Sequence, residues 1–143
     1  MIIGQIKDGI VLDHITAGRG MEIYNILKLS RLNCTVAMIE NAASENMGRK
    51  DIIKIGQVID INLDVLGYID PGITVNIIKD GELVKRQKLS LPERVVGVIK
   101  CKNPRCITSV EQELVHEFRL VDPAHAIYRC IYCESEAQHE YKK

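Results

Sequence analysis

Four cysteines constrain the fold more than any other feature of this sequence. They stand as two close pairs, Cys101-x4-Cys106 and Cys130-x2-Cys133, with 23 residues between the pairs. Each pair can reverse the chain so that two thiolates point at one ion, and the long gap can supply antiparallel strands. The spacing predicts one zinc ion bound by four thiolates. The alternative is four unrelated buried thiols, which pairing at both ends disfavours.

We expect this zinc to be structural. A catalytic zinc usually keeps one coordination position open for water, whereas four thiolates close the shell. His116, His125 and His139 are alternative ligands, but none completes a better spacing than the cysteines. Zinc binding in small modules amounts to roughly 10 to 16 kcal/mol at neutral pH, so the ion would stabilise a segment too small to fold alone.

The rest of the sequence indicates a cytoplasmic protein. The first residues lack a basic start followed by an apolar core, so no secretory signal is recognised. The longest runs without charge have eight residues, against roughly 20 for a membrane span. In a reducing compartment an odd count of five cysteines does not favour disulfides, and Cys34 is expected to be a core residue.

Charge is balanced along the whole chain of 143 residues. Residues 1–94 carry 12 basic and 12 acidic side chains, and residues 95–143 carry 7 of each. Binding to a nucleic-acid duplex depends on clustered Lys and Arg. The balance therefore argues against a nucleic-acid partner, whereas a nucleotide needs only a few cations.

Hydrophobic patterning predicts a ferredoxin-like order in the N-terminal part. Alternation and β-branched residues indicate strands at residues 2–6, 10–15, 35–40, 50–55, 74–78 and 83–88. Apolar spacings of three and four indicate helices at residues 20–29 and 60–68, and residues 41–48 read as a loop. The order is that of a split βαβ sandwich with an added hairpin arm, hence the α+β class.

A proline-containing segment, Ser90-Leu91-Pro92-Glu93-Arg94, separates this part from the cysteines. We place a domain boundary there, with one domain at residues 1–92 and a small all-β, zinc-ribbon-like domain at residues 93–143. The second domain has predicted strands at residues 95–99, 113–120 and 126–129.

Catalytic motifs are not found in the N-terminal part: it has no phosphate-binding glycine loop, nucleophile elbow or H-E-x-x-H. It does have Asp13-His14 at the end of a predicted strand and lysines at positions 50 and 54 of another. On an extended strand, Lys50 and Lys54 share one face with Cα atoms roughly 13 Å apart, which suits separate parts of a nucleotide. A solvated face is the plainer interpretation of the same pair.

Taken in order, several segments resemble the regulatory chain of aspartate carbamoyltransferase. The resemblance is carried by the four-cysteine pattern and by the segments Val11-x-Asp13-His14-Ile15, Met47-Gly48-Arg49-Lys50-Asp51, Thr74-Val75-Asn76 and Ser90-Leu91-Pro92-Glu93-Arg94. It implies a non-catalytic subunit of a complex in pyrimidine biosynthesis. It also implies an N-terminal domain that binds CTP, ATP or UTP-type effectors and pairs with its twin, and a zinc domain that docks on the catalytic chain.

The resemblance also implies roles for individual residues. Asp13 would accept a hydrogen bond from a ribose hydroxyl, and His14 would help to hold the phosphates. Lys54 would contact the ribose or base edge. Lys50 would lie by the phosphates or a second nucleotide, and Asn76 would complete the wall. The backbone of Ile6 would recognise the base.

Two positions of the nucleotide site depart from the family pattern, and the docking residues match only in part. Arg86 stands where a phosphate-binding lysine is usual, and Gly81 stands where a tyrosine occurs. Asn103 and Glu134 match positions that face the catalytic chain, whereas Arg105 and Ile131 replace other polar contacts.

The regulatory mechanism that this implies is a shift between two quaternary states, typically by 1 to 3 kcal/mol. Two other classes remain as alternatives. A zinc-ribbon nucleic-acid module would show an excess of cations around the cysteines, and a small metalloenzyme would need an open zinc site.

Overall fold

The computed structural model describes residues 7–111 and 113–137, and its N-terminal part is a five-stranded antiparallel sheet. The strands lie in the order β2-β3-β1-β4-β5. Their bounds are Gly9–Thr16 for β1, Val36–Ser44 for β2, Gly48–Ile55 for β3, Thr74–Lys79 for β4 and Glu82–Lys88 for β5. The first four strands have the ferredoxin-like order, and β5 extends the sheet beside β4, which confirms the predicted α+β class.

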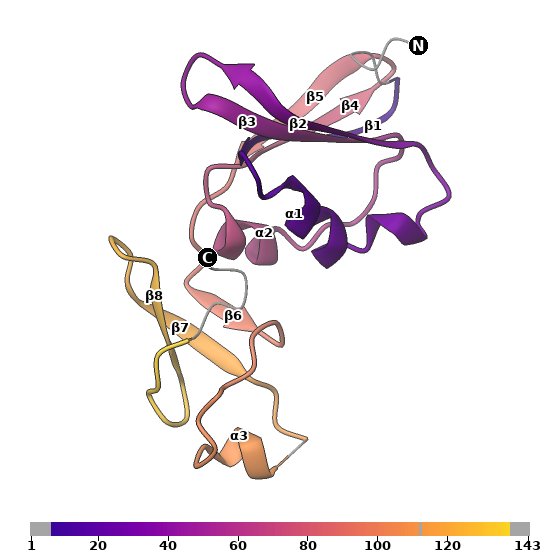
Figure 1. The fold of residues 1–143 in the computed structure, drawn as a ribbon. Helices are drawn as coiled ribbons and strands as arrows, with labels where there is room; N and C mark the ends of the chain where they lie inside the picture. The colour runs from indigo at the N-terminus through magenta and orange to yellow at the C-terminus, as the bar shows by residue number, and fades with distance from the viewer. Residues whose placement is uncertain (1–6, 112, 138–143) are drawn as a thin grey trace.

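Two short helices, α1 (Gly20–Ile26) and α2 (Leu63–Ile69), lie on the same side of this sheet (Figure 1). The strands alternate accordingly. In β3, Ile53 and Ile55 are fully buried toward the helices, whereas Lys50 and Lys54 are half-buried on the other face. The apolar face of the sheet and the two helices thus form the core, and the polar face remains available for a site.

Local capping explains where the helices begin and end. The Asn62 side chain accepts hydrogen bonds from the backbone N–H groups of Asp64 and Val65 at the start of α2. Helix α1 is shorter than the predicted helix at residues 20–29. Lys28, with φ of 55°, turns the chain into the 3-10 helix η1 (Leu29–Arg31).

The prediction of a loop at residues 41–48 was wrong. Strand β2 continues to Ser44 and β3 begins at Gly48, so only a tight turn connects them. The polar residues of this stretch concealed the pairing, and a bulge between Ile39 and Ala42 shifts the register within β2. The predicted strand at residues 2–6 lies outside the described residues.

A second, three-stranded antiparallel sheet follows in the order β6-β7-β8 (Figure 1). Its strands are β6 (Arg94–Val96), β7 (Glu117–Asp122) and β8 (Ile127–Cys130), and the one-turn helix α3 (Ile107–Val110) precedes β7. Val95, Phe118 and Tyr128 are its buried centre. Both β6 and β7 are shorter than predicted. Gly97, with φ of 72°, bends the chain away after β6, and β7 begins at Glu117 rather than at residue 113.

The two sheets meet through α2 and β8. Tyr68 and Tyr128 pack edge to face with ring centroids 4.9 Å apart. The Tyr128 hydroxyl donates to the Pro92 carbonyl oxygen at 2.5 Å. At Gly67 of α2, an added Cβ would lie 2.3 Å from the Ser90 carbonyl oxygen, so this close approach requires glycine. The chain between the sheets is therefore closely packed against both of them.

Across the described residues, every helix is too short or too polar to cross a membrane.

Candidate functional site

The four cysteine sulfurs form one cluster in which all lie within 4.8 Å of one another. Cys101 Sγ lies 3.6 Å from Cys133 Sγ, and Cys106 Sγ lies 3.7 Å from Cys130 Sγ. A tetrahedral zinc with Zn–S bonds of about 2.3 Å requires sulfurs about 3.8 Å apart. The donor set and its spacing therefore fit one structural zinc, with each close pair presenting its thiolates from a separate turn.

Backbone hydrogen bonds shape the two turns. In the first, Cys106 N–H donates to the Asn103 carbonyl at 3.0 Å, and Arg105 N–H donates to the Asn103 side chain at 3.0 Å. In the second, Glu134 N–H donates to the Cys130 carbonyl at 2.9 Å, with Glu134 in a left-handed conformation at φ of 64°. These bonds give each pair of thiols its common direction.

The thiols differ in how readily they lose their protons. Burial raises the pKa of Cys101 to about 12, and burial also raises the pKa of Cys130. For Cys133, burial raises the pKa, but hydrogen bonds from Ser135, Asn103 and Cys101 outweigh it and lower the value to about 6. A bound cation would thus have to displace protons from the buried thiols, which is the usual coupling of metal binding to proton release.

Two of the alternative histidine ligands have other roles. His116 Nδ1 accepts from the Cys101 backbone N–H at 2.9 Å, so it supports a ligand from outside the cluster. His125 lies 2.8 Å from Asp122 on the surface. His139 is outside the described residues. Sequence reasoning missed the supporting role of His116, because a separation of 15 positions from Cys101 gives no periodic signal.

The two predicted docking residues lie beside this cluster and have partners within the chain. The Asn103 side chain donates to Ser135 Oγ at 3.2 Å. The Glu134 carboxylate accepts from Arg119 at 3.0 and 3.2 Å. Both residues therefore stabilise the second turn and its surroundings, whatever else they contact.

On the polar face of the five-stranded sheet, four side chains form one row across four strands. Lys54 of β3 is paired with Val11 of β1, Val11 with Asn76 of β4, and Asn76 with Arg86 of β5. Directly paired residues of neighbouring antiparallel strands point to the same face. The fold thus brings together three predicted nucleotide-binding residues that are 22 and 10 positions apart in the sequence.

Asp13 of β1 and Lys50 of β3 lie beside this row, two and four residues along their strands from Val11 and Lys54. Lys50 Nζ lies 3.0 Å from Asp13 Oδ1, and both side chains are largely shielded, with exposures of 18% and 23%. Burial raises the pKa of Asp13, but the hydrogen bond from Lys50 and the neighbouring His14 outweigh it, so the pKa lies below its ordinary value. The carboxylate is ionised at neutral pH and can accept from a hydroxyl.

His14 lies in a bulge of β1 and has a left-handed backbone with φ of 59°. Its Nδ1 lies 3.2 Å from Thr74 Oγ1 on β4, which fixes the ring against the neighbouring strand. Asn76 Oδ1 is a buried acceptor with no hydrogen-bond partner among the described residues. An unsatisfied buried acceptor is costly, and a ligand with a donor would satisfy it.

Two nucleotide-site positions remain, Ile6 and Gly81. Ile6, predicted to recognise a base, lies outside the described residues. Gly81 lies in the turn between β4 and β5, where Asp80 and Gly81 have φ of 52° and 77°. Positive φ at both central residues is the hairpin geometry that favours Asp-Gly, so the residue at 81 serves the turn.

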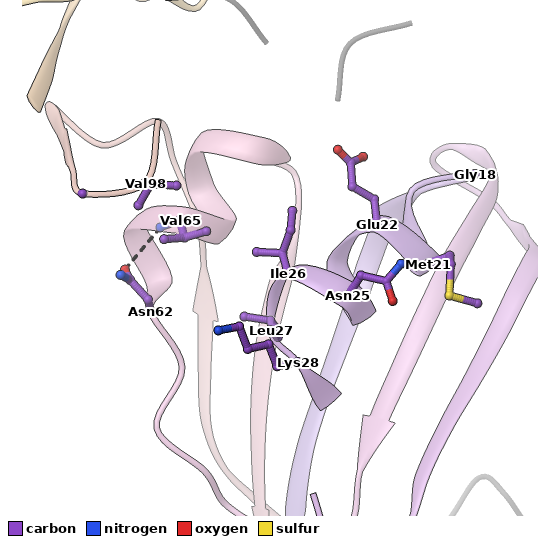
Figure 2. Close-up of a pocket in the computed structure, with 11 residues that line it drawn as sticks. Gly18, Met21, Glu22, Asn25, Ile26, Leu27, Lys28, Asn62, Val65 and Val98 are labelled. Carbon is purple, nitrogen blue, oxygen red and sulfur yellow. Dashed lines mark hydrogen bonds between the residues drawn. The ribbon is translucent and has the colours of Figure 1, made fainter. Parts of the chain in front are cut away.

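A separate hollow of about 890 Å³ lies on the helix side of the sheet (Figure 2). It lies between α1, the start of α2 and the segment at Val98, and apolar side chains such as Met21, Ile26 and Val65 line it. None of the predicted binding residues lines this hollow. The polar row and the hollow are therefore different features on different faces.

The fold and these sites define a metal-binding protein with a ferredoxin-like sheet that carries a cationic row. The N-terminal part, residues 1–90, matches the model of the aspartate carbamoyltransferase regulatory chain, allosteric domain. Residues 93–142 match the metal binding domain of the same regulatory chain. The chain therefore belongs to the aspartate carbamoyltransferase regulatory chain family, and it is a regulatory rather than a catalytic chain.

Curated relatives with the same description agree over nearly the whole length. The regulatory chain of Clostridium acetobutylicum is 51% identical over 134 residues, covering 94% of this chain and 92% of the relative. That of Clostridium tetani is 50% identical over 135 residues, covering 94% of each. That of Bifidobacterium longum is 41% identical, covering 96% of this chain and 99% of the relative.

Proposed function

We propose that the polar face of the five-stranded sheet binds CTP, ATP or UTP-type nucleotides as allosteric effectors in pyrimidine biosynthesis. The observation that carries this proposal is the row of Lys54, Asn76 and Arg86 on one face, with the Asp13–Lys50 pair beside it. It combines cations for phosphate, a carboxylate for a hydroxyl and an amide for a base or sugar edge. Ile6 is proposed to contribute its backbone to base recognition.

The roles that the family resemblance implies fit the chemistry of each group. Asp13 accepts a hydrogen bond from a ribose hydroxyl, His14 helps to hold the phosphates, and Lys50 lies by the phosphates or a second nucleotide. Lys54 contacts the ribose or base edge, and the buried Asn76 oxygen accepts from a ligand donor. Arg86 replaces a usual lysine with a planar fork of donors, which suits two phosphate oxygens at once.

The second part of the proposal concerns the zinc domain, taken as residues 93–143 with the nucleotide domain at residues 1–92. With one zinc bound by Cys101, Cys106, Cys130 and Cys133, it docks on the catalytic chain, using Asn103 and Glu134. Exposed apolar side chains around α3 support this, because Ile107, Val110 and Val115 have exposures of 51%, 72% and 55%. The full chain would work in the cytoplasm.

We also propose that the chain pairs with a second copy of itself through the nucleotide domain. Within residues 7–137 as far as the structure describes them, the sheet has two edge strands, β2 and β5. Strand β5 carries Lys85, Arg86 and Lys88, and lysines on an edge discourage pairing. Strand β2, VAMIENAAS, has a single charged residue, which makes it the better edge for an isologous contact.

Isothermal titration of CTP, ATP and UTP into the zinc-loaded chain tests the nucleotide site. Lys54→Met is expected to weaken binding at least tenfold, because a cation that faces the ligand is removed. Lys79→Met is the charge-matched control, since Lys79 is exposed at the end of β4 and outside the row. No binding at millimolar nucleotide, or equal losses in both variants, would reject the site. Copurification with a transcarbamoylase chain and one zinc per chain tests the docking.

A further inference from the structure

Asp51 is a fully buried carboxylate whose role the proposed site does not include. Its exposure is 0%, and it lies on the helix face of β3, next to Lys50, which points to the opposite face. Its oxygens accept three backbone hydrogen bonds. Oδ2 accepts from Gly18 at 3.1 Å and from Gly20 at 2.8 Å, and Oδ1 accepts from Asn41 at 2.8 Å. One side chain therefore joins the β1–α1 connection to β2 across β3.

Both strands beside β3 are irregular at the level of Asp51. The register of β1 shifts between Leu12 and Ile15, and that of β2 shifts between Ile39 and Ala42. Each irregularity contains a residue with left-handed backbone, His14 and Asn41, both with φ of 59°. Such conformations persist only where the surroundings hold them. Asp51 holds Asn41 directly through its backbone N–H, and on the β1 side it holds Gly18 and Gly20, in the segment that follows the irregularity at His14.

The irregularity in β1 decides which face its side chains take. It allows Ile15 to return to the core, where it is fully buried and paired with Asp51, while Asp13 keeps its contact with Lys50. Bulges commonly re-aim side chains in this way. Gly20 is part of the same arrangement, because an added Cβ would lie 2.8 Å from Asp51 Oδ2.

We propose that Asp51 is a positioning residue of the nucleotide site: it holds the bulge of β2 and the β1–α1 connection beside β3, and thereby places Lys50 against Asp13. This inference rests on the proposed function. Asp51 touches no ligand; it acts through the backbone that places the Lys50 ammonium group. The prediction is specific, because an effect that runs through Lys50 has to vanish once the Lys50 ammonium group is absent.

A double-mutant cycle with CTP as the probe tests this in the full zinc-loaded chain. Asp51→Asn, which replaces an acceptor with a donor facing backbone N–H groups, is expected to weaken CTP binding about tenfold. Lys50→Met is expected to weaken it by a similar factor, and the double variant by no more than either one. Hydrogen exchange at the amides of Gly18 and Gly20 is expected to accelerate in Asp51→Asn and in the double variant, but not in Lys50→Met.

Controls separate positioning from loss of stability. Asn62→Ala removes the cap of α2 and lowers stability without touching β3, and it is expected to bind CTP normally. If Asp51→Asn does not fold, Gly20→Ala displaces the same carboxylate from the other side and is expected to show the same loss. Normal CTP binding by the tested variant, or losses that multiply in the double variant, would overturn the inference. A wild-type chain that does not bind CTP, ATP or UTP would overturn the proposed nucleotide site, and this inference with it.

Discussion

Tyr68 of α2 and Tyr128 of β8 contact each other edge to face, with ring planes at 79°. This contact joins the two sheets, and the Tyr128 hydroxyl holds the connecting segment through Pro92. Because burial raises the pKa of both hydroxyl groups, that of Tyr128 to about 12, the tyrosines remain neutral across the physiological range.

Two substitutions at Tyr128 should separate the stability that comes from its hydroxyl group from the stability that comes from its ring. Tyr128→Phe keeps the ring contact but leaves the Pro92 carbonyl without its donor, at a cost of about 1 to 2 kcal/mol. Tyr128→Ala also removes the ring and is expected to cost about 3 to 5 kcal/mol. Chemical denaturation of the zinc-loaded chain measures both, and equal losses in the two variants would show that the ring contributes nothing.

Gly67→Ala tests the close approach of α2 to the segment between the sheets. The new methyl would meet the Ser90 carbonyl oxygen at 2.3 Å, a backbone atom that cannot swing away. We expect a loss of about 3 kcal/mol, at the upper end of ordinary overpacking. Gly72→Ala is the matched control, because its nearest neighbour is 3.6 Å away. A thermal midpoint unchanged by Gly67→Ala would contradict the packing described.

Removal of zinc should unfold the second sheet and leave the first intact. The second sheet has few buried apolar residues, whereas an ion bound by four thiolates contributes roughly 10 to 16 kcal/mol in small modules. Chelation followed by amide hydrogen exchange is expected to show loss of protection at Phe118 and Tyr128 but not at Leu12 and Ile53. Retained protection at Phe118 after complete metal loss would argue against this.

The Asp13–Lys50 pair makes the stability of the folded chain depend on pH, and the direction of this dependence follows from the pKa of Asp13. The folded pKa of Asp13 lies below its ordinary value of 3.8. Its contribution to stability is therefore fully present above pH 3.8 and is lost as the pH falls through the lower folded value. Carboxyl NMR titration is expected to show the pKa of Asp13 rising in Lys50→Met. An unchanged value would mean that His14 and the backbone account for the shift.

Much of this architecture could be predicted from local sequence patterns. The alternation in β3 placed Lys50 and Lys54 on one face correctly, since a period of two follows directly from strand geometry. The cysteine pairs predicted the sulfur cluster, because ligand spacing reflects a tight turn at each pair. The order of strands and helices then gave the ferredoxin-like sheet.

The features that escaped prediction depend on contacts between distant segments. Gly97 ended β6 early through a positive φ that no periodicity reveals. Asp51 was recognised only as a member of the Met47–Asp51 motif, although a carboxylate in alternation with Ile53 and Ile55, on the buried face of the strand, was a usable signal. The role of His116 required knowing that its ring lies against the Cys101 backbone. The roles of the individual nucleotide-site and docking residues stay predictions.

The paired row on the outer sheet face has a spacing that the strands fix. Lys54, Val11, Asn76 and Arg86 leave from four neighbouring strands, and each strand lies about 4.8 Å from the next, so the ends of the row are about 14 Å apart whatever the side chains are. Replacing one head group by another, such as the guanidinium group of Arg86 in place of a lysine ammonium group, changes the chemistry at that position. The position of its Cα atom in the row stays the same. Preference among ligands of similar length can thus change by single substitutions while the scaffold stays as it is.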